Sequence, residues 1–315
     1  MPRSFVWTLY AGCVLVWSST WVVIAVGLDD IPPFFGAGIR FALAGLGVLS
    51  ATALSKRPLR TDFVLSAIVG LLPFAVSYGL IYWAEQYVTS GLAAVLFGVL
   101  PLYVALLAAL FLPAEPLRAR LLLGVAIAFA GLIVAFGQSI HLGGEHAALA
   151  ATAVVLSPLG SAIGNIAIKK RPADPLAMNG WAMLIGGATL LVVSVFAEDW
   201  GDATWTPTAI GSIVYLAAFG TGFTFVTLTV LLRELPAVTV SFISMIIPFG
   251  ALALGALFRD ETVTALAVLG ALLVAAGIAV AQLRLPRRSA KRSPSRNAQA
   301  PAEPAPGGKR LPRSR

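Results

Sequence analysis

Residues 101–117 read PLYVALLAALFLPAEPL, and residues 248–263 read PFGALALGALFRDETV. The prolines that begin the two stretches lie 147 residues apart, and the triplet Ala-Leu-Phe follows both at the same distance. One residue is missing from the second copy, so Glu115 aligns with Glu261 at a spacing of 146. Two glycine pairs keep that spacing: Gly124 with Gly270, and Gly131 with Gly277. Proline, glutamate and glycine in one register indicate an internal duplication.

The composition assigns this duplicated chain to a membrane. Of its 315 residues, 58% are hydrophobic and 11% are charged, against about 25% charged in soluble domains. The mean hydropathy of +0.89 excludes both a water-soluble fold and a disordered chain. Because Cys13 is the single cysteine, an internal disulfide framework and a cysteine metal cluster are excluded, and two histidines leave little for any other metal site.

Ten apolar stretches have the length of about 20 residues that a transmembrane helix needs. They are Phe5–Gly27, Pro33–Leu54, Phe63–Ala84, Ser90–Leu112, Ala119–Gly137, Ala147–Ile168, Leu176–Ala197, Pro207–Leu232, Pro236–Phe258 and Val263–Leu283. A β-barrel is disfavoured, because its strands are about 10 residues long and alternate apolar with polar residues. The first stretch exceeds the length of a signal-peptide core and no small-residue cleavage site follows it, so we expect it to remain as a span.

The distribution of positive charge predicts the orientation. With the N-terminus inside, the cytoplasmic segments contain 20 of the 22 Lys and Arg residues. The positive-inside rule therefore predicts that both termini are cytoplasmic. The tail at 284–315 is rich in Pro, Ser, Ala and basic residues, so we expect it to be disordered and able to contact anionic lipid headgroups. Nucleic-acid binding is disfavoured, since cytoplasmic segments of membrane proteins are routinely basic.

Five spans in each half is an odd number, so the second copy must cross the membrane upside down. Glu115 is then inside and Glu261 outside. The predicted fold is an all-α membrane protein whose ten transmembrane helices form two inverted five-helix repeats, at 5–137 and 147–283. Inverted repeats are typical of secondary transporters, because two equivalent half-units can exchange conformations around a site at the midplane.

Several stretches resemble the EamA-type branch of the drug/metabolite transporter superfamily. They are WSSTW at 17–21, RFALA at 40–44, residues 87–117 with 124–135, and the second-half counterpart at 236–263. The similarity covers residues 5–283 and implies a ten-helix inverted-repeat fold in the inner or plasma membrane, with a central cavity and export of small metabolites, often amino acids. One departure is that the sixth span, with LSPLGSAIGN, lacks the tryptophans of the first. The two halves should therefore line a cavity with different chemistry.

Polar and aromatic residues inside the spans are the candidates for substrate binding. The full set is Trp17, Ser18, Thr20, Trp21, Arg40, Tyr78, Tyr82, Ser161, Asn165, Ser241 and Ser244. Tryptophan rings can stack on an apolar or cationic ligand, and hydroxyls can bind a substrate or only their own helix. Tyr78 and Tyr82 belong to a stripe that begins at Phe74 and ends at Glu85. Such a stripe could line the pathway or only pack between helices.

Arg40 is the only charged residue well inside a span. It could contact a carboxylate, but we favour a structural role in which it caps backbone carbonyls. Asn165 likewise needs a partner in hydrocarbon, either another helix or a substrate.

The predicted function is a secondary transporter that exports small neutral or zwitterionic metabolites such as amino acids. Efflux of amphipathic compounds is the alternative. An intramembrane enzyme would need a nucleophile with a base, or a metal set, which the spans lack, and the duplication argues against a non-transporting scaffold. No cofactor is expected, because a nucleotide-binding loop is missing. The energy source stays open between exchange, facilitated flow and a proton handled by Glu85 or by the substrate.

Overall fold

The computed structural model describes residues 1–137, 145–171, 173–259 and 264–282. The predicted disordered tail and Glu261 lie outside these residues. Within the described part the chain is helical and has no strands, and ten helices are long and apolar enough to cross a membrane. The predicted all-α fold with ten spans is confirmed, and the ends of the predicted spans differ from the helix ends by only a few residues.

Six spans are continuous helices and four are divided. The continuous helices are α1 (Arg3–Leu28), α2 (Pro33–Leu54), α7 (Ala119–Phe136), α8 (Ala147–Lys170), α9 (Pro175–Ala197) and α14 (Ala265–Gln282). The divided spans are α3 (Phe63–Val69), η1 (Gly70–Ser77) and α4 (Tyr78–Ala84); α5 (Ser90–Phe97) and α6 (Leu100–Phe111); α10 (Pro207–Tyr215), η4 (Leu216–Phe223) and α11 (Thr224–Glu234); and α12 (Ala237–Ser241) and α13 (Ile243–Arg259).

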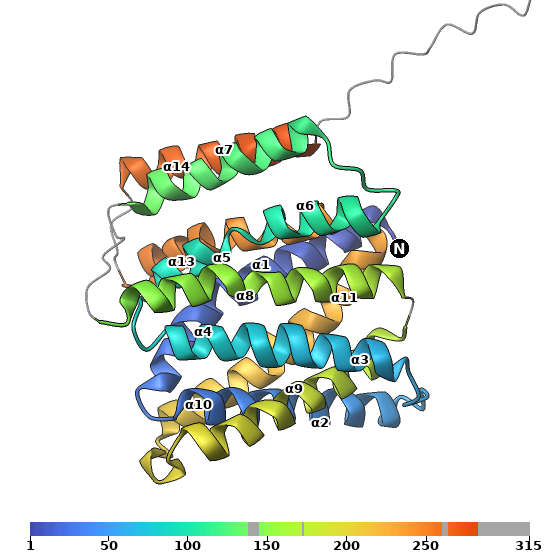
Figure 1. The fold of residues 1–315 in the computed structure, drawn as a ribbon, viewed down its shortest axis with the longest axis vertical. Helices are drawn as coiled ribbons and strands as arrows, with labels where there is room; N and C mark the ends of the chain where they lie inside the picture. The colour runs from blue at the N-terminus through green and yellow to red at the C-terminus, as the bar shows by residue number, and fades with distance from the viewer. Residues whose placement is uncertain (138–144, 172, 260–263, 283–315) are drawn as a thin grey trace, which may run out of the picture. The chain divides into compact units, whose positions relative to one another are not determined.

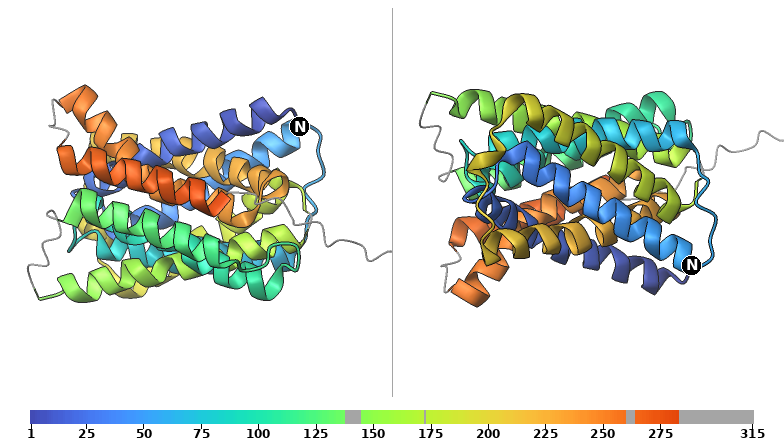
Figure 2. Two further views of the ribbon diagram at one scale, coloured as in Figure 1. Left: turned by 90° about the horizontal axis from the view of Figure 1, so that it is seen from above. Right: turned by 90° about the horizontal axis from the view of Figure 1, so that it is seen from below.

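The packing of the helices repeats between the two halves. α1 packs on α13, and its counterpart α8 packs on α6. The third span packs on α8 and α9, and its counterpart, the eighth span, packs on α1 and α2. Two helices of the first repeat pack directly on their equivalents in the second repeat: α2 on α9, and α7 on α14. The α7–α14 pair lies along one edge of the bundle (Figures 1 and 2).

Close glycine contacts show the relative direction of α7 and α14. A Cβ built on Gly124 would lie 2.5 Å from the carbonyl oxygen of Gly277, and one built on Gly131 would lie 2.7 Å from that of Gly270. The earlier glycine of α7 therefore meets the later glycine of α14, so the two helices run antiparallel. Because the helices occupy the same position in each repeat, the second repeat is inverted, as predicted.

The third and eighth spans each contain a π-helical segment that sequence analysis did not predict. Gly70–Ser77 and Leu216–Phe223 have equal lengths and lie 146 residues apart, the spacing of the duplication. Pro73 lacks the N–H that a continuous helix needs at this point of the first segment. The prolines that begin the two duplicated stretches differ in their local structure: α6 begins beside Pro101, whereas α13 continues through Pro248.

Replacing Gly124 by valine should force α7 away from α14. Overpacking of a tight contact lowers the free energy of unfolding by about 1–3 kcal/mol, and titration of SDS into mixed micelles measures that change. The matched control is Gly47→Val, since a Cβ at Gly47 meets nothing within 4 Å. Equal effects of the two substitutions would contradict the close approach of α7 and α14.

Candidate functional site

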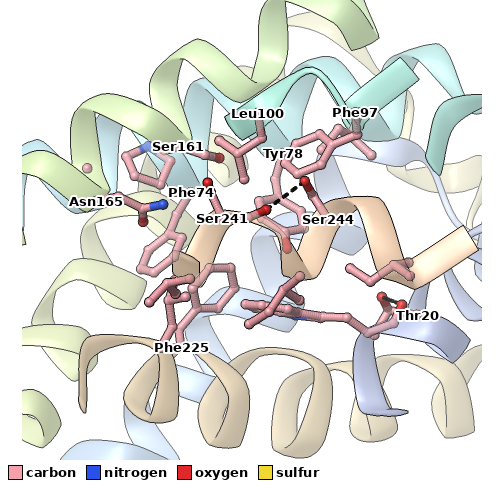
Figure 3. Close-up of a pocket in the computed structure, with 18 of the residues that line it drawn as sticks. Thr20, Phe74, Tyr78, Phe97, Leu100, Ser161, Asn165, Phe225, Ser241 and Ser244 are labelled. Carbon is pink, nitrogen blue, oxygen red and sulfur yellow. Dashed lines mark hydrogen bonds between the residues drawn. The ribbon is translucent and has the colours of Figure 1, made fainter. Parts of the chain in front are cut away.

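A cavity lies between the two repeats, and both repeats contribute to its wall (Figure 3). It contains about 850 Å³ of atom-free space, including any that opens to solvent. Six aromatic side chains line it: Trp17, Trp21, Phe74, Tyr78, Phe97 and Phe225. Seven polar side chains also line it: Thr20, Ser161, Asn165, Asn179, Thr229, Ser241 and Ser244. The described lining includes no charged side chain.

The aromatic walls are held by contacts with one another. Trp17 meets Phe225 edge-on at 5.4 Å between ring centroids, and Phe225 meets Phe74 edge-on at 4.7 Å. On the other side, Trp21 meets Phe97 edge-on at 5.6 Å. Edge-to-face packing at these separations is favourable for aromatic rings. The walls are therefore ordered surfaces on which an apolar or cationic group can lie.

Three hydroxyl groups of the cavity already donate hydrogen bonds to backbone carbonyls. Thr20 donates to the carbonyl of Trp17 at 2.9 Å, and Ser241 donates to the carbonyl of Val238 at 2.8 Å. Ser244 donates to the carbonyl of Ser241 at 2.9 Å. A hydroxyl has one proton but two lone pairs. These groups therefore remain able to accept a hydrogen bond from a solute.

The two amides of the cavity differ in their bonding. Asn179 donates to the carbonyl of Pro175 and to the hydroxyl of Thr229, both at 2.7 Å. Asn165 is only 6% exposed and makes no hydrogen bond within the described part of the chain. Its amide points toward Phe74 and Ser241 in Figure 3. Asn165 is thus the side chain whose donors and acceptor both remain available.

Arg40 lies behind the wall and not in it. The guanidinium is fully buried and donates to the Thr221 hydroxyl at 2.7 Å, the Tyr82 hydroxyl at 3.0 Å and the Gly220 carbonyl at 3.2 Å. It also lies 4.9 Å from the centroid of the Tyr78 ring, which does line the cavity. Arg40 therefore caps a backbone carbonyl, and a direct contact with a substrate stays a prediction.

Eight of the eleven predicted binding residues line this cavity. Ser18, Arg40 and Tyr82 do not. Ser18 donates to the carbonyl of Val14 at 2.7 Å and packs against Gly250. Tyr82 is buried and holds the Arg40 guanidinium.

Sequence analysis missed Asn179, Thr229 and several apolar lining residues. Asn179 could have been found by the argument used for Asn165, because an amide is rare inside a span.

The π segment of the eighth span explains how these residues are held together. The Gly220 carbonyl accepts hydrogen bonds from Trp17 Nε1 at 3.3 Å, Arg40 Nη2 at 3.2 Å and Thr224 Oγ1 at 2.8 Å. A π-helical turn disturbs the regular pairing of backbone groups, and a carbonyl at this depth must find donors inside the protein. The same carbonyl thus fixes one wall of the cavity and the buried arginine.

A cluster of polar and ionic contacts lies next to Ile168, one of the residues that line the cavity. The next residue, Lys169, donates to the carbonyls of Leu232 and Leu235 and lies 3.1 Å from Glu115 Oε1. Glu115 Oε2 accepts from the backbone N–H of Ala237 at 2.8 Å. This cluster, called the Lys169 cluster below, joins the end of α8 to the loop after α6 and to the junction between α11 and α12.

Replacing Arg40 by glutamine should destabilise the protein. Each buried acceptor that loses its donor costs about 1–3 kcal/mol of the free energy of unfolding, and Arg40 serves three acceptors. The measurement is the SDS titration, with Arg233→Gln as control because Arg233 is exposed. An unchanged free energy in Arg40→Gln would show that the buried bonds do not stabilise the fold.

Comparison with known proteins places the fold among transporters. The model of the EamA-like transporter family matches residues 5–137 and again residues 148–282. A solved crystal structure of a protein aligns with a TM-score of 0.75 at 18% identity, covering 89% of this chain and 97% of that one, and this likeness concerns the fold alone.

Three curated relatives cover most of both chains. "Uncharacterized transporter YoaV" of Bacillus subtilis is 29% identical, over 87% of this chain and 95% of its own. "Probable amino-acid metabolite efflux pump" of Escherichia coli is 31% identical, over 84% and 90%. "Uncharacterized inner membrane transporter YedA" of Escherichia coli is 30% identical, over 79% and 81%.

Proposed function

Because the chain belongs to the EamA-like transporter family, we propose that it is a secondary transporter that exports small metabolites, such as amino acids, by alternating access. It is a multi-pass membrane protein, and the proposal places it in the inner or plasma membrane with both termini in the cytoplasm. Two relatives that bear the name "Probable amino-acid metabolite efflux pump", 31% and 30% identical, support the substrate class. The named transporter relatives also favour transport over the enzyme and scaffold alternatives.

The observation that carries the proposal is the cavity at the junction of the inverted repeats. Both repeats line it, with an aromatic and apolar wall and a few polar side chains, which is the usual composition of a small-molecule site. Inverted-repeat transporters bind their solutes where the repeats meet, because movement of one repeat against the other opens that place to each side in turn. The pairing of α2 with α9 and of α7 with α14 provides interfaces on which such movement can occur.

The lining chemistry suits a small zwitterion. The oxygen lone pairs of Ser241 and Ser244 can accept hydrogen bonds from an ammonium group, and the aromatic faces can hold that cation or an apolar side chain. The free amide of Asn165 can donate to a carboxylate. Amphipathic compounds are a second candidate, favoured by the six aromatic side chains and the uncharged lining.

Counterflow of amino acids into liposomes tests this function. We expect uptake of a labelled amino acid to be stimulated by the same amino acid inside the liposome. Trp17→Ala and Asn165→Ala should each reduce the rate about tenfold or more, the effect of losing one or more good contacts worth about 1.4 kcal/mol. Trp7→Ala and Gln86→Ala are the controls, since both side chains are exposed. Normal transport by both cavity variants would overturn the assignment of the site.

The Lys169 cluster provides a second test, because alternating access requires the inner end of the cavity to close. With Cys13→Ala as background, Ile168→Cys places a label site at the closed end. Lys169→Met should increase labelling by an impermeant maleimide added on the cytoplasmic side. Lys170→Met is the control, because Lys170 is exposed and lies over the Phe111 ring instead. Equal labelling with and without Lys169 would contradict the closing role.

A further inference from the structure

A buried carboxyl group lies one residue beyond the end of α4. Glu85 is 8% exposed, and both of its carboxylate oxygens are inaccessible to solvent. Neither oxygen accepts a hydrogen bond from any described residue. A buried ionised carboxylate without donors is very unfavourable, so such groups take up a proton. The C-terminus of a helix, where carbonyls point outward, adds a further negative potential.

The groups that face Glu85 come from three directions. Arg40 on α2 is the one ionisable residue of that helix, and Tyr78 and Tyr82 belong to the same span as Glu85. The α5 helix contributes the hydroxyl of Ser90. The outer half of α8, which packs on α4, carries no ionisable side chain from residue 147 to 157. Burial raises the pKa of the Glu85 carboxyl well above its usual range, and the positive charge of Arg40 offsets this only in part.

Arg40 links this carboxyl to the cavity. Its guanidinium donates to the Tyr82 hydroxyl, one helical turn before Glu85, and lies against the Tyr78 ring of the cavity wall. Its hydrogen-bond partners among the described residues are neutral hydroxyls and a carbonyl. An arginine side chain stays charged in proteins. Its charge is therefore uncompensated while Glu85 holds a proton, and is partly compensated once Glu85 releases that proton.

We propose that Glu85 is the proton-binding site of this carrier, and that its proton sets the net charge that Arg40 and Glu85 together present behind the Tyr78 wall. The site takes one proton from water when the carboxylate becomes exposed, forming the carboxylic acid, and returns it to water by the reverse step. A cationic solute in the cavity then competes with the proton, and an anionic solute binds together with it. This linkage to transport rests on the proposed function, whereas the proton site itself does not.

Infrared difference spectroscopy of the purified full chain tests the proton site directly. The wild-type protein should show the C=O stretching band of a protonated carboxylic acid at neutral pH, and this band should fall to background in Glu85→Gln. Glu85→Asp should keep a titrating band, and Glu145→Gln, which changes an exposed carboxylate near the start of α8, should leave the wild-type band intact. A wild-type spectrum without the band, or a band that survives in Glu85→Gln, overturns the proposal.

Thermal stability gives a second test, because the proposal predicts whether stability rises or falls with pH. Above the ordinary glutamate pKa of about 4.3, the unfolded chain releases the proton while the native chain keeps it, so stability falls as the pH rises toward the native pKa. Glutamine resembles the protonated acid and does not titrate. The apparent melting temperature of Glu85→Gln minus that of the wild type should therefore increase with pH over this window. A difference that is independent of pH contradicts a raised proton affinity.

Amino-acid counterflow separates the two proposals. If the wild type catalyses counterflow, its rate should depend on pH, and Glu85→Gln should retain counterflow while losing that dependence. Counterflow of the wild type that is independent of pH overturns the linkage. If no amino acid is carried, the proposed function fails, and the infrared band alone then decides whether Glu85 binds a proton.

Discussion

Most of the candidate site depends on one backbone carbonyl at membrane depth. In hydrocarbon no water can bond to the carbonyl of Gly220, so donors from the protein must do so. Trp17, Arg40 and Thr224 supply them. Trp17 lines the cavity, Arg40 is the buried cation behind the cavity wall, and Thr224 belongs to the same span as Gly220. The π-helical turn thus couples the position of α1 and α2 to the eighth span, and this coupling explains why irregular backbone persists where a regular helix would be simpler.

The backbone features of the two repeats resemble each other more closely than the side chains that line the cavity do. The two π segments keep the spacing of 146 residues, and the glycines that join α7 to α14 keep it too. Both features concern close backbone packing, which allows little change. The cavity residues do not keep this spacing: the two tryptophans come from the first repeat, whereas Asn165 and the serine pair come from the second. An inverted-repeat backbone and an asymmetric lining are both compatible with the proposed alternating access, because only the backbone would have to fit both arrangements.

The sequence predicted the helices well and the site in part, for physical reasons that can be named. A span is recognised by its apolar length, which no neighbouring segment changes, so its ends were nearly correct. Whether a residue faces the cavity depends on helix rotation, and one residue of error separates Trp17, which lines the cavity, from Ser18, which bonds its own helix. Arg40 was recognised by its charge, but its place behind Tyr78 depends on tertiary contacts. Neither π segment was predicted, because an apolar run of this length is equally compatible with a regular helix, and a proline or glycine inside a span does not specify a π-helical turn.

The distribution of charge is compatible with the proposed binding and release of solutes. The described wall of the cavity is uncharged, so a bound solute would not form an ion pair with it. Such a pair would dissociate slowly in a low dielectric. The charged side chains near the cavity lie outside its described lining. Lys169 pairs with Glu115 next to Ile168, whereas Arg40 lies behind the Tyr78 wall and does not bond to Glu85. In the proposed cycle, the formed ion pair would stabilise closure, whereas the unformed pair would leave a charge whose free energy depends on the proton and on the solute. The two pairs would therefore respond differently to pH.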